Sequence, residues 1–246
     1  MAKKERFIYG IHPILEAVRS GREIDKVLVQ RGSFSTVMKG LLEELNRREI
    51  PVQRVPTEKL NRLTNVNHQG VIAWLSVISY SQLDRLLPTI YEAGEDPLML
   101  LLDEISDVRN FGAIVRSASC AGVHAVIIPA AGSAAINADA VKTSAGALHH
   151  LPVCRVRDMV TAARFLRDSG LRLVAATEKG NSSLFETDMT GPLAIAMGSE
   201  ERGISPSLLK EADTLSSIPM TGKVSSLNVS VAAGIMLFEA IRQRRS

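Results

Sequence analysis

The chain has 246 residues, of which 46% are hydrophobic and 22% charged, with a formal net charge of +3. This length allows one large domain or a small domain joined to a medium one, and the composition excludes disordered and fibrous classes. No apolar run approaches the ~20 residues of a membrane helix, and no secretory signal follows the N-terminus. We therefore expect a soluble, cytoplasmic protein.

The positive charge is concentrated at the N-terminal end. Residues 1–77 contain 13 Lys and Arg against 8 Asp and Glu, a net of +5, whereas residues 97–246 contain 15 against 14, a net of +1. A basic small domain is what docking to a polyanion requires, because phosphate contacts supply sequence-independent affinity. A merely soluble surface explains the charge equally well, so both interpretations stay open.

Residues 1–77 predict a small α/β domain. Helical spacing of apolar residues, or short apolar runs typical of strands, define its elements. We expect helices over residues 10–20, 35–48 and 58–64, and strands over 26–30, 52–55 and 71–76. Residues 78–96 predict a linker, because they include Ser79, Ser81, Pro88 and Gly94 and carry 1 basic against 4 acidic residues, a net of −3.

Residues 97–246 predict a larger α/β domain in which apolar strands alternate with helices. The strands are expected over residues 98–103, 124–129, 171–177, 192–198 and 214–218, and the helices over 110–121, 137–148, 156–169, 205–211 and 227–244. Strands buried on both faces and separated by helices indicate a largely parallel sheet with helices on either side.

The common phosphate-binding motifs of nucleotide-binding α/β domains are absent. Glycines instead follow strands in the C-terminal half, at Gly198, Gly203 and Gly222. Ligands of parallel sheets bind beyond the carboxyl ends of strands, so these turns are the expected pocket walls. The two cysteines have no metal-ligand or disulfide spacing, and no metal is expected.

Three segments stand out in order along the larger domain: Asn110-x-Gly-x-x-x-Arg116, Gly198-x-Glu200-x-x-Gly203 and Ser226-Leu-Asn228-Val-Ser. Together they closely resemble the three motifs of the SpoU (TrmH) family of RNA ribose 2′-O-methyltransferases. The resemblance covers residues 97–246. Residues 6–76, with Tyr-Gly-Ile-His and Asn-His-Gln-Gly, resemble the small substrate-binding domain, related to ribosomal protein L30, of the branch that methylates a guanosine of 23S rRNA.

The resemblance implies an α/β fold with three parts: an L30-like RNA-binding domain over 1–77, the linker over 78–96, and a SPOUT-type catalytic domain over 97–246. The catalytic domain of this family has a parallel sheet with a deep trefoil knot, and it forms a homodimer across the knot. The cofactor implied is S-adenosylmethionine, and the activity implied is 2′-O-methylation of a guanosine ribose in 23S rRNA.

Site residues follow from the same motifs. The resemblance implies catalytic roles for Asn110, Arg116, Glu200, Ser226 and Asn228. It implies cofactor contacts, largely through main chain, at Thr177, Met197, Gly198, Ile218, Met220 and Leu227. Ile218 and Leu227 are expected to sandwich the adenine. A plain core role is the alternative for these apolar residues.

Arg116 lies six residues after Asn110, and helical spacing places the two on different faces, so joint use needs groups from elsewhere or from a second subunit. A guanidinium is nearly always protonated, which favours clamping a phosphate and stabilising alkoxide charge over acting as a base. A surface ion pair is the alternative for Arg116. For Glu200 the alternative is capping of the turn toward Ser205.

Phosphate contacts are expected from basic residues of the small domain, namely Lys3, Lys4, Arg6, Arg31, Arg47, Arg48 and Arg54. The low aromatic content of 4% predicts little base stacking. His12 and His68 fit structural roles at least as well as functional ones.

Two other functions remain open: a tRNA guanosine 2′-O-methyltransferase, and a non-catalytic ribosome- or RNA-binding protein on the same fold. The tRNA branch typically lacks the small N-terminal domain. A binding protein without activity would not need all five of the residues to which the resemblance assigns catalytic roles.

Overall fold

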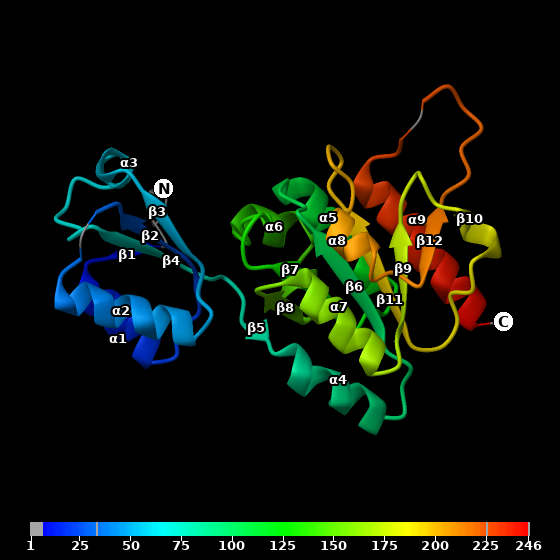
Figure 1. The fold of residues 1–246 in the computed structure, drawn as a ribbon, viewed down its shortest axis with the longest axis horizontal. Coiled ribbons are helices and arrows are strands. Elements are labelled where there is room, and N and C mark those ends of the chain that lie inside the picture. Colours follow the sequence, from blue (N-terminus) through cyan, green and yellow to red (C-terminus); the bar gives the residue numbers. More distant parts are fainter. Residues whose placement is uncertain (1–6, 33, 225, 246) are drawn as a thin grey trace. The chain divides into compact units, whose positions relative to one another are not determined.

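The computed structural model describes residues 7–32, 34–224 and 226–245. The chain divides into two compact units, one ending at Ser79 and the other beginning at Tyr80, each with its own sheet (Figure 1). Within the described ranges, none of the helices combines the length and the apolar character needed to cross a membrane.

The first unit is a four-stranded sheet with two helices on one face. Its elements are β1 (Phe7–Tyr9), α1 (Ile11–Arg19), β2 (Ile24–Gln30), α2 (Thr36–Arg47), β3 (Val52–Val55), α3 (Thr57–Asn61) and β4 (Val71–Leu75). The strand order is β1-β4-β2-β3, with β4 antiparallel to β1 and β2, and β2 parallel to β3. Ile14 of α1 and Leu41 of α2 pack on Val27 and Val71 of the sheet. The expected helices and strands of this unit are confirmed, and β1 is an additional strand.

The interval 78–96 differs from the expected linker. It contains β5 (Tyr80–Ser81), which pairs with β8, and the helix α4 (Leu83–Glu92). Leu83, Leu87 and Ile90 of this helix are buried in the core of the second unit. Pro88 lies in the middle of α4, where it has no N–H to donate to the carbonyl of Asp84, four residues earlier.

The second unit is an eight-stranded sheet in which every pairing is parallel. The strand order is β10-β12-β9-β11-β6-β7-β8-β5. The strands after β5 are β6 (Leu98–Asp103), β7 (Ala125–Pro129), β8 (Val153–Val156), β9 (Arg172–Ala176), β10 (Ser182–Ser183), β11 (Leu193–Gly198) and β12 (Thr214–Ser217). The five predicted strands are confirmed, whereas β8, β10 and β5 were not predicted.

Helices cover both faces of this sheet, as the alternation predicts (Figure 1). They are α5 (Val108–Cys120), α6 (Ala138–Thr143), α7 (Met159–Asp168), α8 (Pro206–Leu209) and α9 (Val229–Arg244), with 3-10 turns η1 (Ala147–His149) and η2 (Leu184–Glu186). One core joins α4, α7 and α8 to alternate strand residues such as Met99 and Leu101. On the other face α5 packs against α9.

The strand β12 lies between β9 and β10, although β10 precedes it in the sequence. The chain therefore crosses β12 between Ala176 and Ser182. Gly180 makes this crossing, and a Cβ there would come 2.7 Å from the carbonyl carbon of Ser216. A later segment passing under an earlier loop is what a threaded chain requires. The trefoil knot itself stays a prediction that this arrangement favours.

The neighbouring strands β6 and β11 end side by side, with Asp103 in register with Gly198. From β6 the chain continues to β7 on one side of this pair, whereas from β11 it continues to β12 on the other side. Such a reversal of strand order opens a crevice at the carboxyl ends, where the following loops diverge.

Candidate active site

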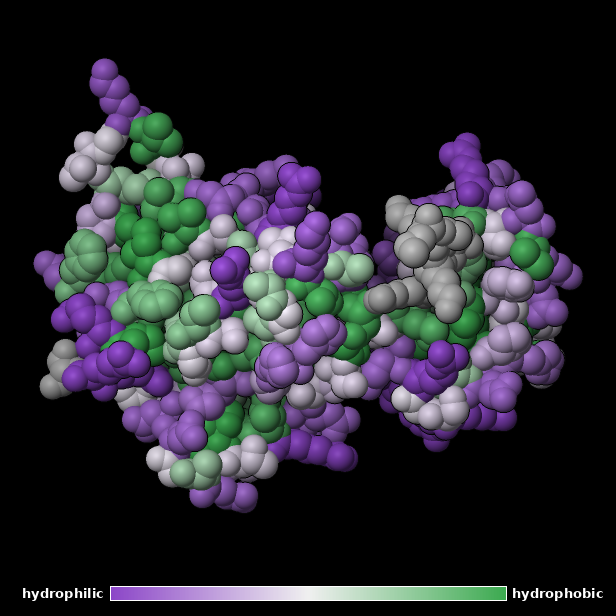
Figure 2. All heavy atoms as spheres, turned by 180° about the vertical axis from the view of Figure 1, so that it is seen from behind, coloured by the Kyte–Doolittle hydropathy of each residue, from purple (hydrophilic) through white to green (hydrophobic). Residues whose placement is uncertain are grey.

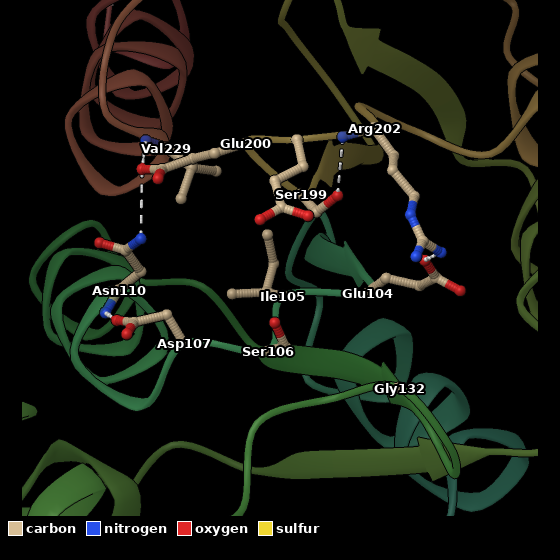
Figure 3. Close-up of a pocket in the computed structure, with 11 residues that line it drawn as sticks. Glu104, Ile105, Ser106, Asp107, Asn110, Gly132, Ser199, Glu200, Arg202 and Val229 are labelled. Carbon is tan, nitrogen blue, oxygen red and sulfur yellow. Dashed lines mark hydrogen bonds and ion pairs between the residues drawn. The ribbon is translucent and has the colours of Figure 1, made fainter.

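Three segments far apart in the sequence meet in this crevice. They are the start of α5 after β6, the loop 199–203 after β11, and the start of α9. Figure 3 shows the side chains of Asn110 and Glu200 pointing toward each other, with Val229 beside them. The three motifs singled out in the sequence each contribute one of these segments.

The Glu200 carboxylate holds the three segments together. Its Oε1 accepts hydrogen bonds from Asn228 Nδ2 at 2.6 Å, from the Val229 backbone N–H at 3.1 Å and from Asn110 Nδ2 at 3.2 Å. Asn228 Nδ2 also donates to Asn110 Oδ1 at 2.9 Å. Among the described residues, the second carboxylate oxygen has no protein partner, which leaves it available to a bound molecule.

Asn110 is placed by the capping of α5. The Asp107 side chain accepts a 2.7 Å hydrogen bond from the Asn110 backbone N–H, which fixes the first turn. Further along, Gly112 lets the helix approach α6, because a Cβ there would come 2.7 Å from Thr143 Cβ. The Gly of the first motif therefore serves helix packing, and through it the position of Asn110.

The loop carrying Glu200 is a tight turn fixed at both ends. Gly203 has φ +68° and donates its backbone N–H to the Ser199 carbonyl at 2.8 Å. A Cβ on Gly198 would lie 2.0 Å from the Gly203 carbonyl carbon, so only glycine permits this approach. The buried Asp103 carboxylate then accepts the Ser205 N–H at 2.8 Å. The capping alternative for Glu200 is thus wrong, since Asp103 binds Ser205.

The start of α9 is organised by Asn228, as the sequence predicts. Its Oδ1 accepts the Ser230 backbone N–H at 3.0 Å, which caps the helix, while its Nδ2 holds Glu200. The Asn228 side-chain amide therefore both accepts a free backbone N–H at the start of α9 and positions the Glu200 carboxylate. Ser226 is exposed two residues before this cap.

A cavity of about 320 Å³ opens beside this cluster. Its lining comes from the ends of β6 and β11 and the starts of α5 and α9, with Gly132 (Figure 3). The lining residues are Glu104, Ile105, Ser106, Asp107, Asn110, Gly132, Ser199, Glu200, Glu201, Arg202 and Val229. Glu104 has a left-handed backbone, with φ 56°, and its carboxylate lies 3.3 Å from Arg202 Nη1. This ion pair joins the segment after β6 to the loop after β11 at the cavity.

The six predicted cofactor residues lie elsewhere along the same edge. Thr177 follows β9, Met197 and Gly198 end β11, and Ile218 follows β12. Met220 and Leu227 expose 39% and 37% of their surface, whereas Met197 is buried at 3%. None of the six lines the cavity. The predicted cofactor contacts therefore lie outside it, at or after the ends of β9, β11 and β12.

Arg116 is not brought into the cavity of its own chain. It lies on α5 with an exposed side chain, about 9 Å along the helix axis from Asn110 and on a different face. The surface ion pair considered as its alternative is not formed within the described ranges. The expected difference in helix face is confirmed.

The predicted RNA contacts of the first unit fall into three groups. Lys3, Lys4 and Arg6 lie outside the described residues. Arg47 and Arg48 are exposed but pair with Glu44. Arg31 and Arg54 are exposed, and the Arg54 guanidinium lies 5.2 Å from the centre of the Phe34 ring.

His68 has a structural role, which was one of the two interpretations. Its Nδ1 accepts the Gly70 backbone N–H at 3.0 Å, so its Nε2 carries the proton and lies 2.8 Å from Asn61 Oδ1. Among the residues that the structure describes, His12 has no comparable hydrogen-bond network.

Sequence reasoning missed Asp103, Asp107 and the pair of Glu104 with Arg202. An acidic residue directly after an apolar strand, and an Asp before a helix, were signals available for the first two. The ion pair joins residues 98 positions apart, and no local pattern indicates it.

Comparison with known proteins agrees with this arrangement. Residues 97–238 match the model of the SpoU rRNA Methylase family, and residues 7–80 match that of the RNA 2′-O ribose methyltransferase substrate binding domain. The 23S rRNA (guanosine-2′-O-)-methyltransferase RlmB of Xylella fastidiosa is 38% identical over 99% of both chains.

Two solved structures add to the comparison. The SpoU methyltransferase AviRb of Streptomyces viridochromogenes, in complex with AdoMet, is 29% identical and covers 96% of this chain and 89% of its own, with a TM-score of 0.61. The TrmH/SpoU tRNA modifying enzyme of A. aeolicus is 32% identical, with a TM-score of 0.56, and covers 66% of this chain and 84% of its own. From the matched motifs, the site they build and these relatives, the chain belongs to the SpoU rRNA methylase family.

Proposed function

We propose that the chain transfers a methyl group from S-adenosylmethionine to the 2′-oxygen of a guanosine ribose in 23S rRNA. The observation that carries the proposal is the hydrogen-bonded cluster of Asn110, Glu200 and Asn228, in which one residue from each family motif meets at the edge of a cavity. The full-length similarity to an RlmB enzyme supports the choice of rRNA guanosine.

The residues beside Glu200 fit the proposed cofactor. The strands β11, β9 and β12 lie side by side, so the loops after them leave the same edge of the sheet. Gly198 packs on the backbone of Gly203, and Gly180 packs on the backbone of Ser216, which brings main chain close together in these loops. Met220 and Leu227 leave apolar surface exposed next to this edge, as a flat adenine ring requires. When bound, S-adenosylmethionine supplies a methyl group on a positively charged sulfur.

The cavity on the other side of Glu200 is the proposed place for the target nucleotide. In the reaction the ribose 2′-oxygen bonds to the methyl carbon, the bond from that carbon to sulfur breaks with its electron pair staying on sulfur, and the hydroxyl proton passes to solvent water. The free oxygen of Glu200 accepts the hydrogen bond of the ribose hydroxyl. Asn110 and Asn228 hold the carboxylate in place, and Ser226 adds a polar group at the entrance.

Arg116 completes this site from a second subunit. Val231 and Phe238 of α9 expose 50% and 52% of their surface, and Figure 2 shows hydrophobic side chains gathered at the upper left, over α9 and the segment leading into it. A second copy of the chain covers this face in the proposed homodimer. Arg116 is exposed on α5 next to Ser117, whose Oγ faces Gly234 of α9, and the proposal puts the guanidinium at the edge of the same interface. There it clamps the phosphate beside the partner's target ribose.

The first unit docks the RNA in this proposal. Its match to a substrate-binding model, its basic composition and its exposed Arg31 and Arg54 support this role. The tRNA-modifying relative of A. aeolicus covers only 66% of the chain, which favours rRNA over tRNA. In this proposal the reaction takes place in the cytoplasm.

The experiment is transfer of radiolabelled methyl from S-adenosylmethionine to unmodified 23S rRNA, with the modified nucleotide mapped by mass spectrometry. We expect one 2′-O-methylguanosine, no label when that position carries 2′-deoxyguanosine, and strong loss with Asn110→Ala. Label in tRNA alone would assign the tRNA alternative. Binding of rRNA with no label in any RNA would assign the non-catalytic one.

A further inference from the structure

One face of the sheet in the first unit carries a row of aromatic side chains and a lysine. Phe7 on β1, Trp74 on β4 and Lys26 on β2 are register partners across three neighbouring strands. The Phe7 and Trp74 ring centres are 5.8 Å apart, and Tyr9 lies 6.4 Å from Phe7. Lys26 Nζ lies 5.6 Å from the centre of the Trp74 ring. We call these four residues the aromatic row.

The aromatic row lies on the face opposite α1 and α2. Those helices pack on Val27, Val71 and Ala73, which alternate with the row residues along the strands. On the row's own face, Leu60 of α3 packs with Leu28, Val55 and Ile72. Phe7 and Trp74 border this small core but stay partly exposed, and Tyr9 is 38% exposed.

A core role alone does not explain this composition. The chain has only 10 aromatic residues, 6 Phe, 3 Tyr and 1 Trp, and three of them meet here. Residues that serve a core alone are usually fully buried, whereas Phe7 and Trp74 keep part of their surface exposed beside the Lys26 ammonium. Partly exposed rings beside a cation, in a domain with a net charge of +5 over residues 1–77, match a ligand with flat faces and negative charge.

We propose that the aromatic row stacks unpaired bases of the RNA substrate, which assigns single-stranded RNA as the feature that the first unit binds. This rests on the proposed function, in which the substrate is RNA. Base stacking on aromatic rings tolerates any sequence, and an adjacent cation neutralises the phosphate. The Lys26 ammonium lies on a flexible stem, and it moves from the Trp74 face to a phosphate when a base takes its place. This proposal departs, for this face, from the expectation of little base stacking drawn from composition.

Trp74 is the only tryptophan of the chain, so its fluorescence reports on this face alone. The full chain is titrated with a single-stranded oligoadenylate of about ten nucleotides and with a duplex RNA of the same length. We expect saturable quenching of Trp74 by the single strand and little by the duplex. The variant Phe7→Leu with Tyr9→Leu should weaken single-strand binding about tenfold, because each stacked base contributes roughly 1–3 kcal/mol.

Two further variants keep the test independent of folding. Lys26→Gln should reduce the slope of log Kd against log salt concentration by about 0.7, which corresponds to one phosphate contact on a single strand. Phe185→Leu, which removes an exposed ring of the second unit, should leave Kd unchanged. Circular dichroism checks that each variant is folded.

The outcomes separate this proposal from the proposed function. If rRNA is methylated and the oligoadenylate binds by anisotropy while Trp74 fluorescence stays constant, the aromatic row is not the binding surface and the enzyme proposal stands. Equal quenching by duplex and single strand would also overturn it. If no RNA binds or is methylated, both proposals fail.

Discussion

Asn228 Nδ2 donates a 2.6 Å hydrogen bond to Glu200 Oε1, and this contact joins the loop after β11 to the start of α9. Because the same Asn228 caps α9 and the same Oε1 accepts from Asn110, the bond sets the relative positions of all three motifs. The carboxylate is thus a structural centre and, in the proposed reaction, the group nearest the ribose.

Replacing Glu200 should affect turnover more than folding. In Glu200→Ala, three donors lose their acceptor, but Glu200 is exposed and water replaces it, so we expect a loss of no more than about 2 kcal/mol in unfolding free energy. We expect kcat to fall by about 10²-fold or more. Glu200→Gln keeps an acceptor for the three donors and should unfold like the wild type while remaining slow. A Glu200→Ala protein that is unfolded by circular dichroism would contradict this.

Gly198→Ala should disturb the loop that carries Glu200. The added Cβ would lie 2.0 Å from the Gly203 carbonyl carbon and 2.1 Å from Ile204 N, and neither backbone atom can move without opening the turn. We expect a loss of at least about 1–3 kcal/mol in unfolding free energy, together with weaker S-adenosylmethionine binding by calorimetry.

Gly40→Ala is the matched control for this glycine. Gly40 lies inside α2 with no atom within 4 Å of a new Cβ, so alanine should raise stability by about 0.5–1 kcal/mol and leave cofactor binding unchanged. Wild-type stability and affinity in Gly198→Ala would show that the turn does not need glycine.

The strands that the sequence predicts most closely are those with a continuous apolar run or a sharp turn at each end. The strand β6 matches residues 98–103, and β3 matches 52–55. The helix α4 escaped prediction because Pro88 and the surrounding turn residues outweighed the apolar spacing of Leu83, Leu87 and Ile90, whose burial depends on the distant α7. The helix in that segment is therefore stabilised by tertiary packing that the local sequence does not indicate.

The sequence predicts those residues of the candidate site that a local motif identifies. Asn110, Glu200 and Asn228 each stand at a strand end or helix start, and parallel strands bring such positions to one edge. The Glu104–Arg202 pair and the close approach at Gly198 depend on segments that meet only in the folded chain. In the proposed dimer Arg116 acts in the partner's site, and no spacing within one chain could indicate where its guanidinium lies.

The stability of α9 should depend on pH through Glu239. Hydrogen bonds from Arg242 and then Gln243 lower the pKa of this carboxyl from its usual 4.5 to about 2. A lowered pKa stabilises the folded state above pH 4.5, and this contribution is lost as the pH falls from about 4.5 to about 2. The Tm difference between wild type and Glu239→Gln should therefore be largest near neutral pH and shrink across that window. Arg242→Gln should reduce the same difference, and a constant difference at all pH values would contradict the assignment.

Mixing two inactive variants tests whether Arg116 acts across subunits. Arg116 is exposed and makes no ion pair within the described ranges, so Arg116→Ala should change unfolding free energy by no more than about 0.5 kcal/mol while abolishing most activity. Arg116→Ala and Glu200→Ala chains are unfolded together, refolded and assayed for methyl transfer. If each site combines Glu200 of one chain with Arg116 of the other, every mixed dimer has one intact site. Random pairing then restores about a quarter of wild-type activity, because half of the dimers are mixed and each has one working site of two. Sites built within one chain would give no recovery, and so would a monomer, which analytical ultracentrifugation of the wild type distinguishes.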